Sequence, residues 1–354
     1  MSNDRADTGA GLAGHGSGTL SSVHIDAYNA ELQDSEGFIG DRASGRAFRA
    51  ILEDERDRIR KADDEDPIGD TPSEEISKKK LDKLLAEGDP QAAGVVLGTI
   101  EEFAQEFAGV LRRFMRLKEW EGTERIVIGG GLRRSRIGEL AIGRTAVLLK
   151  PDFPVDLVPI RYDPDEAGLV GCVHLAPSWI FSGHDSIIAI DIGGSNIRLG
   201  IVELNLKKAS DLSKCAVVAS DLWRHADDEP TREQAVERMV SMIKAMIKQA
   251  DKSDLRLAPF IGIGCPGLIR EDGSIEKGGQ NLPGDWEHES FNLPRLLREA
   301  LPKIDDHEPA ILMHNDAVVQ GLSEVPFMKD VKRWGVMTIG TGLGNARFTN
   351  RSGD

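Results

Sequence analysis

The sequence is poor in cysteine, and this scarcity excludes several kinds of site. Only three cysteines occur in 354 residues, and they are Cys172, Cys215 and Cys265. They are too widely spaced to form a metal-binding or redox pair along the sequence. We therefore expect buried, reduced thiols.

The sequence also lacks positive net charge and long apolar runs. Its 59 acidic and 44 basic residues give a formal net charge of −15, which repels nucleic-acid backbones and anionic membranes. The N-terminal residues are polar and rich in glycine, without the apolar core of a signal peptide, and no run approaches the length of a membrane span. We expect a cytoplasmic protein that has neither nucleic acid nor a membrane as its partner.

The chain contains 40% hydrophobic residues, which is enough to bury a substantial core. Its length of 354 residues suggests about two lobes. The stretch Ile187–Leu204 predicts a buried strand, a glycine turn and a returning strand. The turn consists of Gly193, Gly194, Ser195 and Asn196. Glycines let backbone N–H groups approach a phosphate closely, and Asp191 offers a carboxylate to a magnesium ion or its waters. An ordinary tight hairpin with a chance acid is the alternative interpretation of this stretch alone.

A second glycine hairpin lies near the end of the sequence. Trp334–Phe348 predicts a strand, a turn with Gly340, Thr341 and Gly342, and a returning strand. Two such hairpins in one chain suggest two similar lobes that bind one polyphosphate between them.

Three other stretches carry candidate site residues. A buried strand at 126–128 leads into Gly129, Gly130 and Gly131, where a nucleotide base or ribose could lie on the backbone, although close packing of a helix on a strand would use glycine too. A strand at 310–313 presents Asn315 and Asp316 just before a helix, where α/β proteins place reacting groups, although Asp316 could be a plain N-cap. The loop 278–286 carries Asn281 and Trp286, and both could line a polar pocket.

Helical periodicity is clear elsewhere. We expect helices over about 43–62, 78–87, 90–120, 165–176 and 231–249. Residues 1 to about 22 are expected to form a flexible lead or a mobile loop, in which His15 is the one side chain suited to chemistry.

Taken together, these motifs resemble the ROK sugar kinases of the hexokinase, actin and Hsp70 superfamily. The resemblance rests on DIGGSNIRLG, IGIGCPGLI followed by NLPGDW, HNDA and TIGTGLGNA, in that order over residues 186–348. It implies a two-lobed α/β, ribonuclease H-like (actin-like ATPase) fold. It also implies that the first glycine hairpin binds phosphate with its acid near magnesium, that the Asn-Asp pair binds the sugar with the Asp as base, and that the second hairpin completes the phosphate site.

The first half of the chain resembles the part of such a kinase that normally comes last. RASGRAF, the long helix, RIVIGGGL and DEAGLVGCVHLA follow the family's C-terminal half in its usual order, with IVIGGG as the adenosine site. We therefore expect a circular permutation in which the former termini are joined through Pro177 to Asp185, with a rearranged gene product as the alternative. The expected lobes are 1–164 completed by 317–354, which carries the adenosine side and second hairpin, and 165–316, which carries the first hairpin and the sugar-binding loops.

The chain also departs from the family. The cysteine-rich zinc loop that usually follows the second hairpin is missing, so we expect no zinc. The Glu-x-Gly-His that precedes this loop in the family is represented here only by His15, without a glutamate at 12–14. Gly40 stands where a later sugar-binding Glu would lie, with Asp41 beside it.

The resemblance implies an ATP-dependent kinase of a hexose or N-acetylhexosamine, with Asp316 as the base. Asn315, Asn281 and His15 would bind the sugar, and Asp191 would hold Mg²⁺ through water. The phosphate- and ATP-binding residues would be Gly193, Gly194, Ser195, Asn196, Gly340, Thr341, Gly342, Gly130 and Gly131. A catalytically weak or inactive sugar-binding or regulatory relative is the alternative, and a homodimer is an assembly that the sequence leaves open. A DNA-binding ROK repressor is disfavoured by the charge and by the lack of a basic recognition helix.

Overall fold

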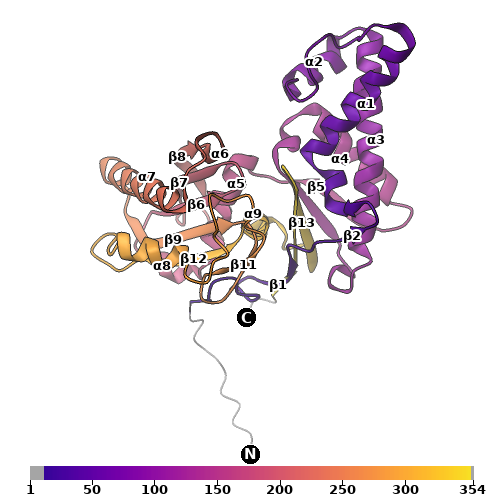
Figure 1. Ribbon diagram of the computed structural model, residues 1–354. Helices are drawn as coiled ribbons and strands as arrows, with labels where there is room; N and C mark the ends of the chain where they lie inside the picture. The colour runs from indigo at the N-terminus through magenta and orange to yellow at the C-terminus, as the bar shows by residue number, and fades with distance from the viewer. Residues whose placement is uncertain (1–11, 352–354) are drawn as a thin grey trace, which may run out of the picture. The chain divides into compact units, whose positions relative to one another are not determined.

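The computed structural model describes residues 12–351, which divide into two compact units (Figure 1). Among these residues, unit 1 contains 12–26, 166–330 and 349–351, and unit 2 contains 27–165 and 331–348. Each unit is built on one five-stranded sheet with helices packed against it. The expected α/β class with two sheet-containing lobes is therefore confirmed.

The sheet of unit 1 has the strand order β12-β9-β6-β7-β8. Its strands are β6 (Ser186–Ile192), β7 (Ile197–Glu203), β8 (Ala216–Trp223), β9 (Leu257–Cys265) and β12 (Ala310–Asn315). The first three form an antiparallel meander, and β9 and β12 continue it in parallel with β6. A short hairpin joins β10 (Leu268–Ile269) to β11 (Ile275–Lys277).

Helices cover both faces of this sheet. They are α5 (Pro164–Gly171), α6 (His225–Asp228), α7 (Arg232–Lys252), α8 (Leu293–Ala300) and α9 (Asp316–Leu322). On one face, alternate isoleucines of β6 pack with α7 and α8 in an apolar cluster. On the other face, glycines allow close approach: a Cβ at Gly262 would lie 2.5 Å from Cβ of Cys172, and one at Gly171 would lie 1.7 Å from the carbonyl oxygen of Val319.

The second sheet, which lies mostly in unit 2 but takes residues 23–26 of β1 and 349–350 of β14 from unit 1, has the order β1-β14-β13-β4-β5. Its strands are β1 (Val23–Tyr28), β14 (Leu343–Asn350), β13 (Arg333–Ile339), β4 (Arg125–Gly129) and β5 (Asp156–Pro159), and a small hairpin pairs β2 (Gln33–Asp34) with β3 (Gly37–Phe38). β4 is parallel to both β13 and β5. The order repeats that of unit 1 when β13, β14, β1, β4 and β5 are matched to β6, β7, β8, β9 and β12. β14 and β1, which match β7 and β8, thus come from opposite ends of the sequence.

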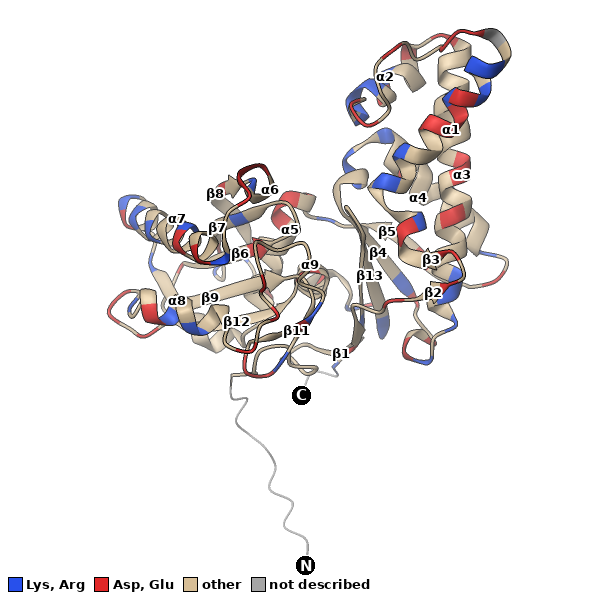
Figure 2. Ribbon diagram, viewed as in Figure 1, with Lys and Arg blue, Asp and Glu red and all other residues tan. Residues whose placement is uncertain are grey.

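Four helices complete unit 2: α1 (Gly45–Asp63), α2 (Lys78–Glu87), α3 (Pro90–Met115) and α4 (Arg136–Leu149). The buried face of α3 carries Phe103, Phe107 and Phe114 at helical spacing, and α1, α2 and α4 pack around it. Figure 2 shows acidic and basic residues interleaved along α1, where Arg56 and Arg60 both pair with Asp66. Short 3₁₀ segments lie at Ile39–Ala43, Lys118–Trp120, Gly131–Arg134, Cys172–His174, Ser178–Phe181 and Val325–Phe327.

Several observed boundaries differ from those expected. The long helix ends at Met115 rather than near 120, and the helix expected over 165–176 ends at Gly171 and continues as a 3₁₀ turn. Residues 317–330 belong to unit 1, because α9 packs on β9 and β12 of that sheet. Within the expected flexible lead, residues 12–22 pack on unit 1, and residues 1–11 lie outside the described part of the chain. No helix in the described part of the chain is long and apolar enough to cross a membrane.

Candidate functional site

The first glycine turn, between β6 and β7, is braced by α6 through two carbonyl oxygens. The Nε2 of His225 donates to the carbonyl of Gly193 at 2.9 Å, and the N–H of Ala226 donates to the carbonyl of Ser195 at 3.2 Å. A carbonyl and the next N–H point in opposite directions across a trans peptide. The N–H groups of Gly194 and Asn196 are therefore directed away from α6.

The same turn consumes one of the amides predicted to support phosphate. The N–H of Gly193 donates to the carbonyl of Asn196 at 2.8 Å, which closes the turn on itself. The amides that the geometry directs outward are those of Gly194 and Asn196. The turn can therefore present donors to an anion without any net charge of its own.

Two carboxylates lie at the carboxyl ends of two strands of this sheet that are separated by one strand. Asp191 comes from β6 and Asp316 follows β12, with the glycine-rich end of β9 between those strands. A Cβ at Gly264 would lie 3.5 Å from Oδ1 of Asp191 and 3.6 Å from Cα of Asp316. Burial, together with both carboxylates, raises the pKa of the Cys265 thiol well above its usual value.

Asp316 is half-buried and is not the N-cap of its helix. Its neighbour Asn315 is the N-cap: Oδ1 of Asn315 accepts from the N–H groups of Ala317 and Val318, at 3.0 and 3.2 Å. The carboxylate of Asp316 therefore does not cap the helix. Burial raises its pKa to about 6, while hydrogen bonds from backbone N–H groups, including that of Ala317, lower it by less. A carboxylate with a pKa near the working pH is suited to accept a proton.

The amide nitrogen of Asn315 also forms a hydrogen bond. Nδ2 donates to the carbonyl of Gly267 at 3.0 Å, and the side chain is fully buried. The structure therefore uses the Asn315 side chain to join β12, α9 and the loop that follows β9. Its predicted contact with a sugar stays a prediction, for which the second N–H of Nδ2 would be the donor.

Asn281 lies against the first glycine turn. A Cβ at Gly194 would come within 3.0 Å of Cβ of Asn281 and 3.7 Å of its Nδ2, and the Asn281 side chain is exposed. The structure thus brings this predicted residue to the phosphate turn. Trp286 behaves differently from the expectation, because it is buried, packs against the tilted ring of Phe291 and donates its Nε1–H to the carbonyl of Pro283 at 2.7 Å.

His15 lies beside β12 at Met313, which precedes Asp316 by three residues. Its Nδ1 accepts from the N–H of Met313 at 3.1 Å, and the N–H of Gly16 donates to the carbonyl of Met313 at 3.0 Å. Burial is the main cause that lowers the pKa of His15, so a neutral ring carries its proton on Nε2. Gly16 has φ of +58°, and a Cβ there would lie 2.1 Å from the carbonyl oxygen of Ile269. This contact fixes the segment tightly against the β10 strand.

The second glycine turn, in unit 2, repeats the bracing of the first. The N–H of Gly340 donates to the carbonyl of Gly342 at 2.9 Å, within the turn. The start of α1 holds the turn through its carbonyls, since the N–H of Gly45 donates to Gly340 at 2.9 Å and Nε of Arg46 donates to Thr341 at 3.2 Å. The N–H groups of Thr341 and Gly342 are consequently directed away from α1.

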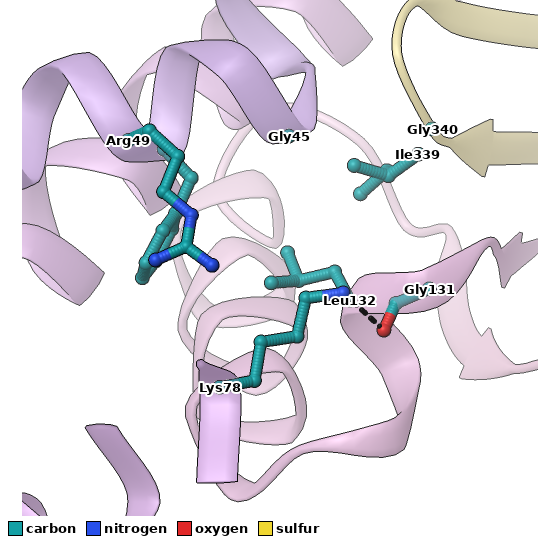
Figure 3. Close-up of a pocket in the computed structure, with 8 residues that line it drawn as sticks. Gly45, Arg49, Lys78, Gly131, Leu132, Ile339 and Gly340 are labelled. Carbon is teal, nitrogen blue, oxygen red and sulfur yellow. Dashed lines mark hydrogen bonds between the residues drawn. The ribbon is translucent and has the colours of Figure 1, made fainter. Parts of the chain in front are cut away.

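A pocket of about 120 Å³ lies beside this turn (Figure 3). It is lined by Gly45, Phe48, Arg49, Lys78, Gly131, Leu132, Ile339 and Gly340. Gly130 has φ of +86°, and a Cβ there would lie 2.2 Å from the carbonyl oxygen of Ile339, so only glycine lets the two turns approach. The structure thus brings the predicted Gly131 and Gly340 together, although nearly 210 residues separate them in the sequence.

Three polar residues at these turns were not predicted from the sequence: His225, Arg49 and Lys78. Lys78 belongs to the run KKK at 78–80, which is typical of a solvated helix face. Its Nζ nevertheless donates to the carbonyl of Gly131 at 2.7 Å. His225 and Arg49 carry no sequence signal that distinguishes them from ordinary surface residues.

The two sheets share this strand order. Each has a braced glycine turn, between β6 and β7 in one sheet and between β13 and β14 in the other. These features define a protein of the ribonuclease H-like, actin-like ATPase fold class. The model of the ROK family matches residues 187–352. These residues are therefore similar to the ROK family, and the resemblance noted in the sequence is confirmed over this stretch.

The chain is also similar to individual members of that family. It is 26% identical to the glucokinase of Thermotoga maritima over 166 residues, which is 46% of this chain and 44% of the glucokinase. A solved ROK family glucokinase from Streptomyces griseus, in complex with glucose and AMPPNP, matches with 19% identity and a TM-score of 0.35, over 48% of this chain and 47% of that one. The ROK hexokinase of Thermus thermophilus matches with 19% identity and a TM-score of 0.30, over 45% of each chain. The chain thus spans less than half the length of the relatives it matches.

Proposed function

We propose that this chain is an ATP-dependent sugar kinase that transfers the γ-phosphate to a hydroxyl of a hexose or N-acetylhexosamine. The observation that carries the proposal is the position of Asp316. It is a half-buried carboxylate with its pKa raised to about 6, at the carboxyl end of β12, near Asp191 and a braced glycine turn. The ROK family match over residues 187–352 supports the same assignment.

Asp316 would act as the general base. As the sugar hydroxyl attacks the γ-phosphorus, its proton passes to the Asp316 carboxylate, the bond from the γ-phosphorus to the bridging oxygen breaks, and ADP leaves. Phosphoryl transfer depends mainly on positioning and charge neutralisation, so the base contributes part of the rate. Removal of a general base typically costs about 10²- to 10⁴-fold.

Asp191 would hold Mg²⁺ through water, and the bound ion would neutralise charge on the phosphates. The surroundings of Asp191 fit this role, because Gly168 leaves the space that its carboxylate occupies. A Cβ at Gly168 would lie 2.5 Å from Cγ of Asp191. A single carboxylate with several waters is a usual arrangement for Mg²⁺ that also binds substrate phosphates.

Each of the two turns would bind phosphate in its own unit. In unit 1 the donors would be the outward amides of Gly194 and Asn196 with the hydroxyl of Ser195, and Gly193 would act through the shape of the turn. In unit 2 the amides of Thr341 and Gly342 would serve, with Gly340 shaping that turn. Gly130 and Gly131 would face the adenosine, and their place beside the unit 2 pocket supports this.

Sugar binding would rest on Asn281 and His15 more than on Asn315. Asn281 is exposed at the first turn, and the Nε2–H of His15 is the donor left after Nδ1 accepts from Met313. Asn315 would act indirectly, by holding α9 so that Asp316 stays at its first residue.

We further propose that the chain is a circular permutation of the family's usual order. The support is the sheet of unit 2, in which the strand order of unit 1 recurs only when β13 and β14 precede β1. A backbone hydrogen bond also joins the two ends of the described chain, since the N–H of Arg351 donates to the carbonyl of Ser22 at 3.0 Å.

The experiment is an ADP-release assay with Mg²⁺, ATP and a panel of hexoses and N-acetylhexosamines, with Asp316→Asn as the control. Sugar-dependent turnover that this substitution abolishes supports the kinase and gives the substrate class. Calorimetric sugar binding without turnover from the folded wild-type protein would overturn the proposal. It would favour a sugar-binding or regulatory relative, and the committed amide of Asn315 is the observation in favour of that alternative.

A further inference from the structure

The unit 2 pocket contains two cationic side chains that have only carbonyl partners. Figure 3 shows the ammonium group of Lys78 and the guanidinium of Arg49 reaching into the same space from α2 and α1. Lys78 donates to the carbonyl of Gly131 at 2.7 Å, while Nη1 of Arg49 donates to the carbonyls of Ser73, at 2.9 Å, and Ile76. Within residues 12–351, neither cation forms an ion pair with a carboxylate.

This arrangement is electrostatically unfavourable without a ligand. Burial, followed by the positive charges of Arg49 and Arg134, lowers the pKa of Lys78 and outweighs the opposing charge of Asp165. Burial likewise lowers the pKa of Arg49 and outweighs the opposing charge of Glu74. Buried charges are ordinarily paired with opposite charge or bound to a ligand. Two cations that repel each other in a chain of net charge −15 therefore indicate that an anion completes the pocket.

Neighbouring contacts hold α2, and hence Lys78, in place. Asp82 lies one turn after Lys78 on α2 and accepts from the N–H groups of Arg136 and Ile137, at 3.1 and 2.9 Å. These two contacts tie α2 to the start of α4, and the bond from Lys78 ties it to the Gly131 turn.

The loop before α2 is anchored in the same way by a buried arginine. Arg56 donates to the carboxylate of Asp66, the carbonyl of Gly69 and the hydroxyl of Ser73, at 2.8, 2.7 and 2.7 Å. The carbonyl that orients Arg49 comes from the same Ser73. The positions of both cations are thus set before a ligand arrives.

We infer that Lys78 and Arg49 form a binding site for a phosphate group, which, resting on the proposed function, belongs to the nucleoside polyphosphate. An ammonium has three N–H donors and a guanidinium five, so each cation keeps donors after its described bonds. Phe48, Leu132 and Ile339 form the apolar part of the lining and would contact the uncharged part of the ligand. The site thus assigns a role in binding to α2.

The test is calorimetric binding of ADP, adenosine and inorganic pyrophosphate to the full chain and to Lys78→Met, Lys78→Gln and Lys78→Arg. Lys78→Gln keeps a donor for the carbonyl of Gly131 but removes the charge. Lys79→Met is the matched control, because Lys79 is the next residue of α2 and is exposed. Thermal unfolding of each variant verifies that it is folded.

We expect Lys78→Met and Lys78→Gln to weaken ADP binding by about 10- to 100-fold, because a charge-assisted contact to phosphate is lost. Adenosine binding should change little, and Lys78→Arg should retain most of the ADP affinity. Equal ADP affinity in folded Lys78→Gln and the wild-type protein would overturn the inference.

The pyrophosphate arm separates this inference from the proposed function. If the wild-type protein binds pyrophosphate but no nucleotide, and Lys78→Gln abolishes that binding, the anion site stands and the nucleotide-dependent kinase falls. If ADP binds with an affinity that is insensitive to Lys78 and turnover persists, the kinase stands and the anion site falls.

Discussion

The imidazole of His225 is linked to the backbone of Gly193 by a hydrogen bond of 2.9 Å from Nε2 to the carbonyl oxygen. His225 is buried and makes an edge contact with Trp223, with ring centroids 6.0 Å apart. The bond orients the peptide that follows Gly193, and so directs the N–H of Gly194 outward. A side chain that touches no ligand can therefore set the geometry of the first glycine turn.

We predict that His225→Phe raises KM for ATP by about tenfold or more, because it keeps an aromatic ring beside Trp223 but leaves the Gly193 carbonyl without its donor. A buried carbonyl that loses its partner costs about 1–3 kcal/mol. His225→Gln can place an amide nitrogen near the Nε2 position and should recover part of the loss. Steady-state kinetics against ATP and against sugar would check this. Exposed His288 provides the control, and a rise confined to KM for the sugar would contradict the prediction.

The raised pKa of Asp316 predicts the pH dependence of turnover. If Asp316 must be deprotonated to accept the sugar proton, kcat should fall about tenfold per pH unit below pH 6 and level off above it. The profile should be recorded with saturating ATP and sugar. A kcat that stays constant from pH 7 to pH 5 would show that another group is the base.

The same carboxylate should make the folded protein less stable at neutral pH. Its folded pKa of about 6 lies above the unfolded value, so the folded state binds the proton more tightly, and the stability it contributes below pH 4 is lost as pH rises through 6. We predict that Asp316→Asn increases the free energy of unfolding by about 2 kcal/mol at pH 7.5, and by much less near pH 4.5. Urea denaturation at both pH values measures the difference. Equal gains at the two pH values would contradict the linkage.

Gly168→Ala should impair catalysis through Asp191. The added methyl would lie 2.5 Å from Cγ of Asp191, so the carboxylate must move. We expect kcat to fall at least tenfold and the Mg²⁺ concentration for half-maximal rate to rise. Gly109→Ala in α3 is the control, since nothing lies within 4 Å of its added Cβ, and it should stabilise the helix by about 0.5–1 kcal/mol. Unchanged kinetics in Gly168→Ala would argue against a role for Asp191.

The permutation predicts that the chain tolerates reordering. A gene that encodes residues 178–351 followed, through a short Gly-Ser linker, by residues 12–177 would restore the family's usual order. Termini that lie close together in compact units generally permit such changes. We expect a cooperatively folded protein with similar circular dichroism and sugar-dependent turnover. A reordered chain that fails to fold, while the original folds, would contradict the permutation.

Strong periodicity and turn chemistry made much of the fold predictable. Lys78–Glu87 is a helix with the bounds expected from the sequence, and the two glycine hairpins lie between the strands expected for them. The sequence correctly predicts Asp316 at the end of a strand, but it also allows Asp316 to be the N-cap of the next helix. Only the contacts of Asn315 show that Asn315 is the N-cap. The sequence cannot distinguish these two neighbours, because either residue type is a good cap.

The unpredicted part of the site consists of single contacts between distant segments. His225 reaches Gly193 across 32 positions, and Lys78 reaches Gly131 across 53. Such contacts leave no periodic pattern, and a lysine in a KKK run has the appearance of any solvated lysine. Tertiary structure alone decides which of the three lysines faces the pocket.

Cys265 provides an internal reporter of the strand ends that carry the two acids. Its thiol is fully buried, and its pKa is held high by that burial and by Asp316 and Asp191, so it cannot react while the native packing persists. Alkylation at this position would then measure how often this edge of the sheet opens, as amide hydrogen exchange does for a backbone group. A ligand that binds only the closed form should slow the labelling as it fills its site. The alkylation rate of Cys265 would then report the fraction of protein that has ligand bound beside it.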